Sequence, residues 1–249
     1  DCSSRGLGDV YKRQDLDIVT ASKTDSSSNG KVTWWENGGS GTWAANDIAT
    51  NVDARSVYVE DIDGDGDLDV VAALFTQNTI KLYLNSGASN PVWTASNIDT
   101  NAKGATDVHA ADMDGDGYLD VVSSSLDDDT IAWYKNDGQS SPGWTSTNID
   151  TSRSSARAVD VADMDGDGDL DIVTASSGDD TIAWYANGGQ STPSFTKTDI
   201  SNTADGARDV RAADMDGDGD IDIVSASYTD STIASVSYTH LTLPTSYPV

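Results

Sequence analysis

The sequence predicts an all-β fold, specifically a partial β-propeller made of four-stranded antiparallel blades of about 51 residues. Two observations lead to this prediction. An eleven-residue stretch occurs four times, beginning at Asp61, Asp112, Asp163 and Asp214, so that successive copies start 51 residues apart. Between the copies lie short runs of β-branched and aromatic residues, separated by turn residues and without helical periodicity. A repeat of this length that holds several short strands is typical of propeller blades.

One unit, residues 156–206, illustrates the expected blade. A first strand enters the recurring stretch and a second strand leaves it. A turn of small and acidic residues follows at 177–180, and two further strands complete the unit. We expect the four strands at 156–162, 170–175, 181–185 and 195–200.

The repeat divides the chain into whole and partial blades. Three full units are expected at 54–104, 105–155 and 156–206, with a partial blade before them at 15–53 and another after them at 207–235. Because closing into a ring is what hides the edges and faces of the blades, an incomplete set predicts an open arc. The alternative is a strained five-bladed closure, in which the strand at 207–213 docks on the blade at 15–53. In that first blade, the turn at 23–30 is longer than its counterparts and is expected to be the most mobile loop.

The two ends of the chain do not follow the repeat. Residues 4–14 and 236–245 resemble a translated sequencing-library adapter, since their reverse translations contain inverted copies of one another. We therefore interpret 1–14 and 236–249 as adapter-derived and set them aside in the prediction of the fold. The only cysteine, Cys2, lies in the first of these segments, which leaves no thiol for catalysis, zinc binding or a disulfide in the repeats.

The recurring stretch has the composition of a cation-binding loop. Each copy has Asp at positions 1, 3, 5 and 9, and Gly at positions 4 and 6, where the backbone must turn tightly. Carboxylate and carbonyl oxygens suit a hard cation with six to eight ligands, which favours Ca²⁺ over Mg²⁺. Position 7 is Asp in three copies but Tyr118 in the second, as expected of a position that contributes only its carbonyl. About four Ca²⁺ ions per chain are predicted.

Two other interpretations of the loop were weighed. An EF-hand loop begins similarly, but it requires Glu at position 12 and a helix on each side. Here position 12 is Ala72, Ser123, Thr174 or Ser225, and the flanks favour strands. The other interpretation is an acidic solvated turn that binds no metal; the identical spacing in four copies argues against it.

Aromatic residues recur at fixed places in the units. Trp34, Leu82, Trp133 and Trp184 share one position, and Trp43, Trp93, Trp144 and Phe195 share another. Sugar stacking is one interpretation, but packing between blades explains the regularity better. Trp35, which aligns with Tyr83, Tyr134 and Tyr185, has the opposite strand parity and is expected to be the exposed ring.

One position on the first strand varies from unit to unit, in a way that packing does not explain. It is occupied by Tyr58, His109, Asp160 and Arg211. In every unit the residue just before it is a valine: Val57, Val108, Val159 or Val210. In a propeller the first strands line the central channel, so these four residues, together with Trp35, form a candidate ligand surface. The other interpretation is an unconstrained face toward solvent. His109 has no Ser or Cys partner at a catalytic spacing.

The charge of the chain restricts its partners. The formal net charge is −28, with 42 acidic and 14 basic residues. Nucleic acid and anionic membrane surfaces are therefore not expected as partners. No apolar run approaches the 18 residues or so that a spanning helix needs, so membrane insertion is not expected either.

The D-x-D-G-D-G-x-x-D loop at a blade-length period resembles the FG-GAP/VCBS repeats of bacterial secreted and surface proteins, which are related to the integrin α-subunit propeller. The resemblance covers nearly all of the repeats. It implies Ca²⁺ ligands at positions 1, 3, 5 and 9 and at the carbonyl of position 7. By number these are Asp61, Asp63, Asp65, Asp67 and Asp69; Asp112, Asp114, Asp116, Tyr118 and Asp120; Asp163, Asp165, Asp167, Asp169 and Asp171; and Asp214, Asp216, Asp218, Asp220 and Asp222. The Phe-Gly and Gly-Ala-Pro elements of the integrin version are absent, so integrin-like ligand recognition is not implied.

The function expected from these features is that of a non-catalytic binding or adhesion module in a secreted or cell-surface protein, with a glycan or an extracellular protein as ligand. Exposed calcium sites of this kind often have a Kd near 10⁻⁴–10⁻³ M, a concentration that Ca²⁺ reaches outside cells. The alternative is the propeller part of an extracellular carbohydrate-active enzyme, such as a polysaccharide lyase. A linear calcium-binding spacer fits poorly, because its units would be shorter and would have little core.

Overall fold

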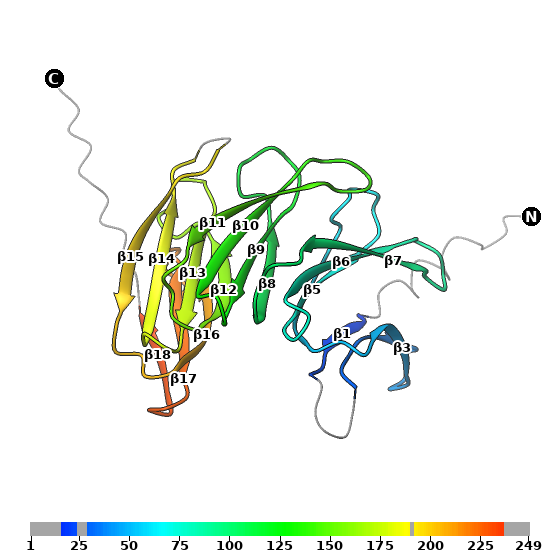
Figure 1. The fold of residues 1–249 in the computed structure, drawn as a ribbon, viewed down its shortest axis with the longest axis horizontal. Coiled ribbons are helices and arrows are strands. Elements are labelled where there is room, and N and C mark those ends of the chain that lie inside the picture. Colours follow the sequence, from blue (N-terminus) through cyan, green and yellow to red (C-terminus); the bar gives the residue numbers. More distant parts are fainter. Residues whose placement is uncertain (1–15, 24–28, 190–191, 237–249) are drawn as a thin grey trace, which may run out of the picture.

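The computed structural model describes residues 16–23, 29–189 and 192–236, and within these ranges it contains strands and no helix. Eighteen strands form five separate antiparallel sheets (Figure 1). The first sheet contains β1 (Ile18–Ala21), β2 (Lys31–Asn37) and β3 (Trp43–Thr50); the second contains β4 (Ala54–Glu60), β5 (Asp69–Leu74), β6 (Thr79–Asn85) and β7 (Trp93–Asp99). The third contains β8 (Ala105–Ala111), β9 (Asp120–Ser125), β10 (Thr130–Asn136) and β11 (Trp144–Asp150). The fourth contains β12 (Ala156–Ala162), β13 (Asp171–Ser176), β14 (Thr181–Asn187) and β15 (Phe195–Ser201), and the fifth contains β16 (Ala207–Ala213), β17 (Asp222–Ser227) and β18 (Thr232–Val236).

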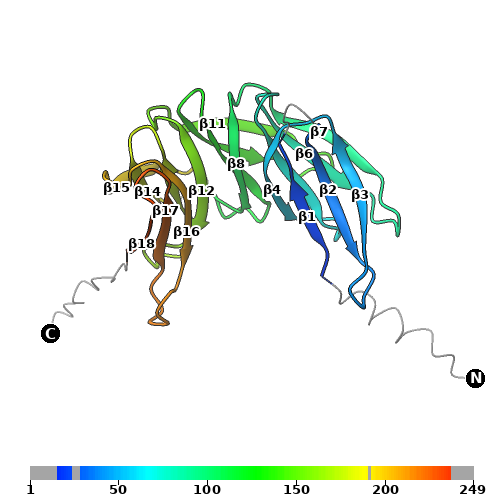
Figure 2. The same ribbon diagram turned by 90° about the horizontal axis from the view of Figure 1, so that it is seen from below.

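The five sheets stand side by side in an open arc, which confirms the predicted fold class (Figure 2). The strands β4, β8, β12 and β16 lie on the concave side of the arc, and β3, β7, β11 and β15 lie on its outer side. The first and last sheets remain apart at the mouth of the arc, so the five-bladed closure is not formed. The limits assigned to the individual blades stay predictions. The adapter-like ends lie outside the described residues except for Val236, and so does most of the long turn of the first blade, 24–28.

In the second to fifth sheets, the turn between the second and third strands contains a residue in the left-handed backbone region. Asn78, Asp129, Asp180 and Ser231 have φ between 54° and 58°. Asn and Asp tolerate this conformation better than other residues with a Cβ, which explains how the turn forms without glycine at this position. Three of these side chains also accept a backbone N–H from the segment that begins the next sheet: Asn78 from Gly104 at 3.0 Å, Asp129 from Ser155 at 2.8 Å and Asp180 from Gly206 at 2.8 Å.

The hydrophobic core lies between neighbouring sheets rather than at the centre of one body. One cluster joins Leu82 of the second sheet with Val108 and Tyr134 of the third. Another joins Trp133 of the third sheet with Tyr185 of the fourth. Each blade is therefore stabilised by the blades beside it, as in other repeat architectures.

The predicted exposure of Trp35 is observed, but the reason given for it was wrong. Trp35 is 38% exposed, whereas the aligned Tyr83, Tyr134 and Tyr185 are at most 4% exposed. These positions thus face the preceding blade: Tyr134 donates its hydroxyl to Asp99 at 3.1 Å. Trp35 is exposed because its sheet is at the end of the described arc, where none of the described sheets covers it.

Asparagine side chains link neighbouring sheets at the end opposite the turns that contain Asn78, Asp129 and Asp180. Asn136 is 1% exposed, and its Nδ2 donates to the carbonyls of Ile62, in the preceding sheet's first loop, and Leu119, in its own. Asn187 makes the same pair of bonds to Met113 and Leu170. At Asn85, the described residues provide only the bond within the sheet, to Leu68.

This difference predicts the strength of one inter-blade bond. Replacing Asn136 with Ala leaves the Ile62 carbonyl without its side-chain donor, while the matched Asn85→Ala change removes only a bond within one sheet. We expect Asn136→Ala to lower the free energy of unfolding by about 1 kcal/mol more than Asn85→Ala. Urea denaturation of both variants measures the difference, and equal losses would show that the inter-blade bond contributes nothing.

Candidate metal centres and concave pocket

Each acidic loop is a hairpin connection between the first and second strands of a sheet. In the loop from Asp61 to Asp69, Gly64 and Gly66 have φ of 75° and 95°, a region that favours glycine. The loop closes on Asp61, whose Oδ1 accepts the N–H of Gly64 at 2.9 Å and whose Oδ2 accepts the N–H of Gly66 at 2.9 Å. The loops that begin at Asp112, Asp163 and Asp214 share the bond from the second glycine to position 1. Position 1 therefore shapes the loop even before any ion is considered.

The aspartate at position 9 attaches the loop to the third strand. Asp69 Oδ2 accepts the N–H of Ile62 at 3.0 Å, and Asp69 Oδ1 accepts the N–H of Asn85 at 2.8 Å. The same two bonds occur at Asp120 and Asp171. These side chains are at most 1% exposed. Burial raises the pKa of all three carboxyl groups to about 6, despite the opposing effect of the hydrogen bonds.

The structure brings carboxylates of every loop together. In each of four groups of three, ligand atoms lie within 4.8 Å of one another. The first two groups combine positions 1, 3 and 9, and the last two combine positions 1, 3 and 5. The groups are Asp61, Asp63 and Asp69; Asp112, Asp114 and Asp120; Asp163, Asp165 and Asp167; and Asp214, Asp216 and Asp218.

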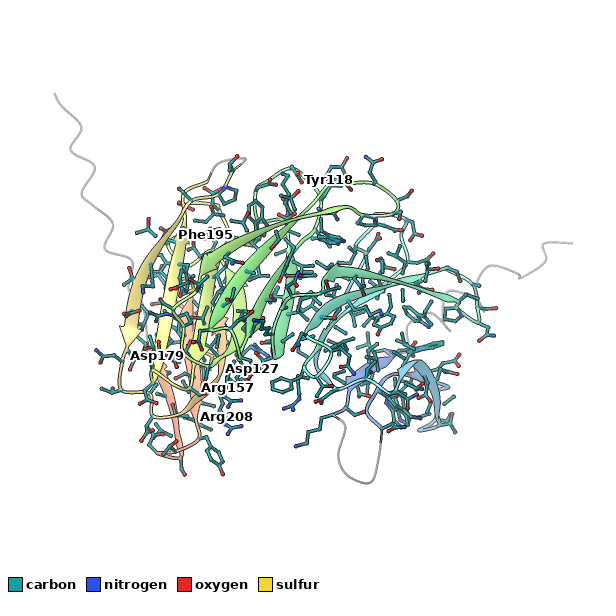
Figure 3. All side chains as sticks on the ribbon, viewed as in Figure 1. Tyr118, Asp127, Arg157, Asp179, Phe195 and Arg208 are labelled. Carbon is teal, nitrogen blue, oxygen red and sulfur yellow. The ribbon has the colours of Figure 1, made fainter. Side chains whose placement is uncertain are left out.

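The residues at position 7 lie against the exit from the third strand. The side chain of Asp67 leaves no room for a Cβ at Gly87, and those of Tyr118 and Asp169 do the same at Gly138 and Gly189. This placement suits the expectation that position 7 offers its carbonyl rather than its side chain. Figure 3 shows Tyr118 at one end of the sheets, opposite the end where Arg157, Arg208 and Asp179 lie.

The residues present fit a calcium ion. The donors are all oxygens, and one of them lacks any partner: Asp114 Oδ1 is buried and accepts no hydrogen bond within the described part of the chain. A buried carboxylate oxygen without a donor is costly unless a cation is close. Lys135, on β10 of the same sheet, reaches this loop: its Nζ contacts Asp114 and lies 2.8 Å from Asp116 Oδ2. Partial burial disfavours the charged ammonium, but these two carboxylates outweigh it and raise the pKa of Lys135.

A second candidate site lies on the concave face. Tyr58, His109, Asp160 and Arg211, which come from β4, β8, β12 and β16, line one open cavity of about 150 Å³. His109 Nδ1 lies 3.0 Å from Asp160 Oδ1, and the rings of Tyr58 and His109 are 4.4 Å apart. The four residues at the variable position therefore come together in one pocket. Trp35 does not line this pocket.

The carboxyl groups of this pocket are held by neighbouring strands. Burial would raise the pKa of Asp160, but hydrogen bonds from His109 and from the N–H of Ala212 lower it below its ordinary value. Asp107, which the sequence analysis did not single out, also lines the cavity. Its Oδ2 accepts the N–H of Val159 at 3.1 Å, and burial raises its pKa. The signal that could have found it is that its position also varies, with Ser56, Ala158 and Asp209 in the other units.

These features define an incomplete array of propeller blades that carries one acidic hairpin loop on each of four blades. Comparison with family models finds the FG-GAP-like repeat four times, at residues 9–72, 61–123, 114–174 and 163–225. The chain belongs to the FG-GAP-like repeat family.

Comparison with solved structures supports the fold alone. A protein from Lactobacillus plantarum superposes with a TM-score of 0.54 at 15% identity, over 89% of this chain and 67% of that one. The V. cholerae biofilm matrix protein Bap1 gives a TM-score of 0.37 at 19% identity, over 75% of this chain and 38% of that one, and carries no argument here. A comparison with curated proteins gives no match. In the described ranges no helix is long and apolar enough to cross a membrane.

The buried aspartates predict how stability changes with pH once metal is removed. In a chelator, burial holds the pKa of Asp69, Asp120 and Asp171 at about 6 in the folded chain, above the ordinary value of 3.8. Protonation therefore stabilises the folded state, and this stabilisation is lost as the pH rises from about 4 through 6. We expect the Tm in EDTA to fall across that window.

Saturating Ca²⁺ should reverse the slope, because bound carboxylates must be ionised. Scanning calorimetry between pH 4 and pH 7, with and without Ca²⁺, measures both slopes. The same slope in both conditions would contradict a role of these carboxylates at a metal site.

Proposed function

We propose that the chain is a calcium-binding, non-catalytic binding or adhesion module of a secreted or cell-surface bacterial protein. The observation that carries the proposal is the convergence of three aspartates in each of four loops, with the buried Asp114 Oδ1 left without a donor. Without a cation the carboxylates inside each group repel one another, so ion binding stabilises the loops and the strands that they join.

The role of calcium is to stiffen one edge of the arc. Three of the loops are bonded through their position 9 aspartate to their own third strand, and the Asn136 and Asn187 side chains join two of the loops to the next sheet. An ion that holds a loop in shape therefore also supports the contact between sheets. The extracellular setting follows from the calcium concentration that the sites need, because exposed sites with a Kd near 10⁻⁴–10⁻³ M fill only where Ca²⁺ is abundant.

Calorimetric titration of the full chain tests the calcium sites. We expect binding to approach four Ca²⁺ per chain at saturation, with a Tm well above that in EDTA. Asp163→Asn should remove one site of the four, since it takes a charged ligand from one loop while keeping a side chain of the same size. The matched control is Asp47→Asn, a surface aspartate paired with Lys31 outside the loops, which should leave the stoichiometry unchanged. No binding at millimolar Ca²⁺ would show that the loops are only acidic turns.

The concave pocket is the proposed ligand-contacting surface. It offers a tyrosine ring, a histidine, a guanidinium and two carboxylates, which together suit the hydroxyl groups and apolar faces of a glycan. An extracellular protein side chain is the other ligand considered. Trp35 stands apart at the end of the arc, where its exposed ring is available to stack on a sugar.

A second candidate function is the propeller part of a carbohydrate-active enzyme, and the pairing of His109 with Asp160 is the observation that favours it. A carboxylate at Nδ1 orients an imidazole so that Nε2 is available to exchange protons with a substrate.

One pair of variants separates the two functions. We expect His109→Ala and Arg211→Ala to reduce glycan-array signals at least about fivefold with little change in Tm, because both side chains face the cavity. Trp35→Ala should change binding only for ligands that reach the end of the arc. In the same preparation, no cleavage of acidic polysaccharides is expected. Cleavage that disappears in His109→Ala would replace the binding-module assignment with the enzymatic one.

A further inference from the structure

One of the four acidic loops is contacted by a lysine of its own sheet. Lys135 lies on β10, directly after Tyr134, and its ammonium group contacts Asp114 and Asp116 of the loop that opens the same sheet. The corresponding positions in the second and fourth sheets are Leu84 and Ala186, which carry no charge. The ammonium group is thus particular to one loop and not part of the repeat.

The same loop also has fewer carboxylates than the others. Tyr118 replaces the aspartate found at position 7 in the other three copies, so the loop has four aspartates where they have five. Counting Lys135, its formal charge is less negative by two units. Position 7 is expected to offer only its carbonyl, so the number of charged ligands is unchanged, but the lower negative charge of this loop attracts the ion less strongly.

The geometry shows that the loop still requires a positive charge. The Asp114 side chain has no exposed surface, and its Oδ1 has no hydrogen-bond donor among the described residues, while Lys135 contacts Oδ2. A single ammonium therefore neutralises only part of the negative charge of the buried Asp114 and the more exposed Asp116. The loop is held in shape by Lys135 when no metal is bound, and a metal must compete with that ammonium.

We propose that Lys135 is an internal counterion that makes the loop at 112–120 the weakest of the four calcium sites. Calcium enters this loop only by displacing the ammonium from Asp114 and Asp116, whereas no such displacement is needed at 61–69 or 163–171. The loop of the third sheet, at the centre of the arc, is then the last to bind calcium as the calcium concentration rises. This inference rests on the proposed calcium function.

The first experiment compares calcium titrations of the full chain at fixed ionic strength. In the unmodified chain we expect three sites of similar affinity and one at least about tenfold weaker. Asp112→Asn should abolish the weak phase, and Asp163→Asn should abolish one of the strong sites. Lys135→Met, which keeps much of the side-chain length but removes the charge, should bring the weak site to within about threefold of the others.

A reciprocal variant and a control make the test independent of one substitution. Ala186→Lys places an ammonium at the equivalent position of the fourth sheet and should create a second weak site. Lys31→Met removes a lysine that pairs with Asp47 away from the loops, and it should titrate like the unmodified chain. In EDTA, Lys135→Met should lower the Tm, because Asp114 and Asp116 lose the counterion that the described residues provide, and saturating Ca²⁺ should restore it.

The outcomes separate this inference from the function on which it rests. Four equal sites in the unmodified chain, unchanged by Lys135→Met, would overturn the role of Lys135 and leave the calcium function standing. A weak site that Asp112→Asn does not remove would also overturn it, since the weakness would then belong to another loop. Absence of calcium binding in every variant would overturn both.

Discussion

The structure depends on a buried carboxylate at the base of each loop. In the loops that begin at Asp61, Asp112 and Asp163, the position 9 aspartate accepts the N–H of the loop's second residue and the N–H of the asparagine that ends the third strand, so one side chain fixes the loop, the hairpin and the third strand together. Asp17 keeps this role where the rest of the loop is missing: it accepts the N–H of Asn37 at 2.8 Å and the Trp34 indole N–H at 2.9 Å. The carboxylate is therefore structural first. Its burial is costly for a charged group, and a nearby cation is the natural means of offsetting that cost.

The blades are coupled at both ends of the sheets by polar side chains and between these ends by the hydrophobic clusters. At the loop end, Asn136 and Asn187 reach carbonyls of the preceding loop; at the other end, Asp129 and Asp180 accept N–H groups from the segment that begins the next sheet. Such contacts extend only to the nearest neighbour, as expected of a repeat protein. This explains how an incomplete set of blades can form an ordered arc, and it also explains why the end sheets expose residues such as Trp43 and Trp35 that their counterparts bury or half-bury.

The sequence was sufficient to predict the blades, the open arc and the four acidic loops, because strand patterning and ligand spacing repeat with the same period. It was also sufficient to select Tyr58, His109, Asp160 and Arg211, which the structure brings into one pocket. It could not identify the asparagine links, since Asn136 is read as a turn residue until its partner in another sheet is known. The ion pair of Lys135 was equally hidden, because β10 and the loop are adjacent only after the hairpins pair. The wrong reason given for Trp35 shows the same limit: strand parity gives the face, and the neighbouring blade decides whether that face is covered.

The most direct test of the account is a crystal structure of the chain grown in calcium, with the ions located by anomalous scattering. We predict one peak inside each of the four loops, bound by the carboxylates of positions 1, 3 and 5 and the carbonyl of position 7, with position 9 close enough to complete the site. We also predict that the arc remains open. Loops that keep their present hydrogen bonds and show no anomalous peak at millimolar calcium would contradict the account, and the acidic hairpins would then be structural elements of the blades alone.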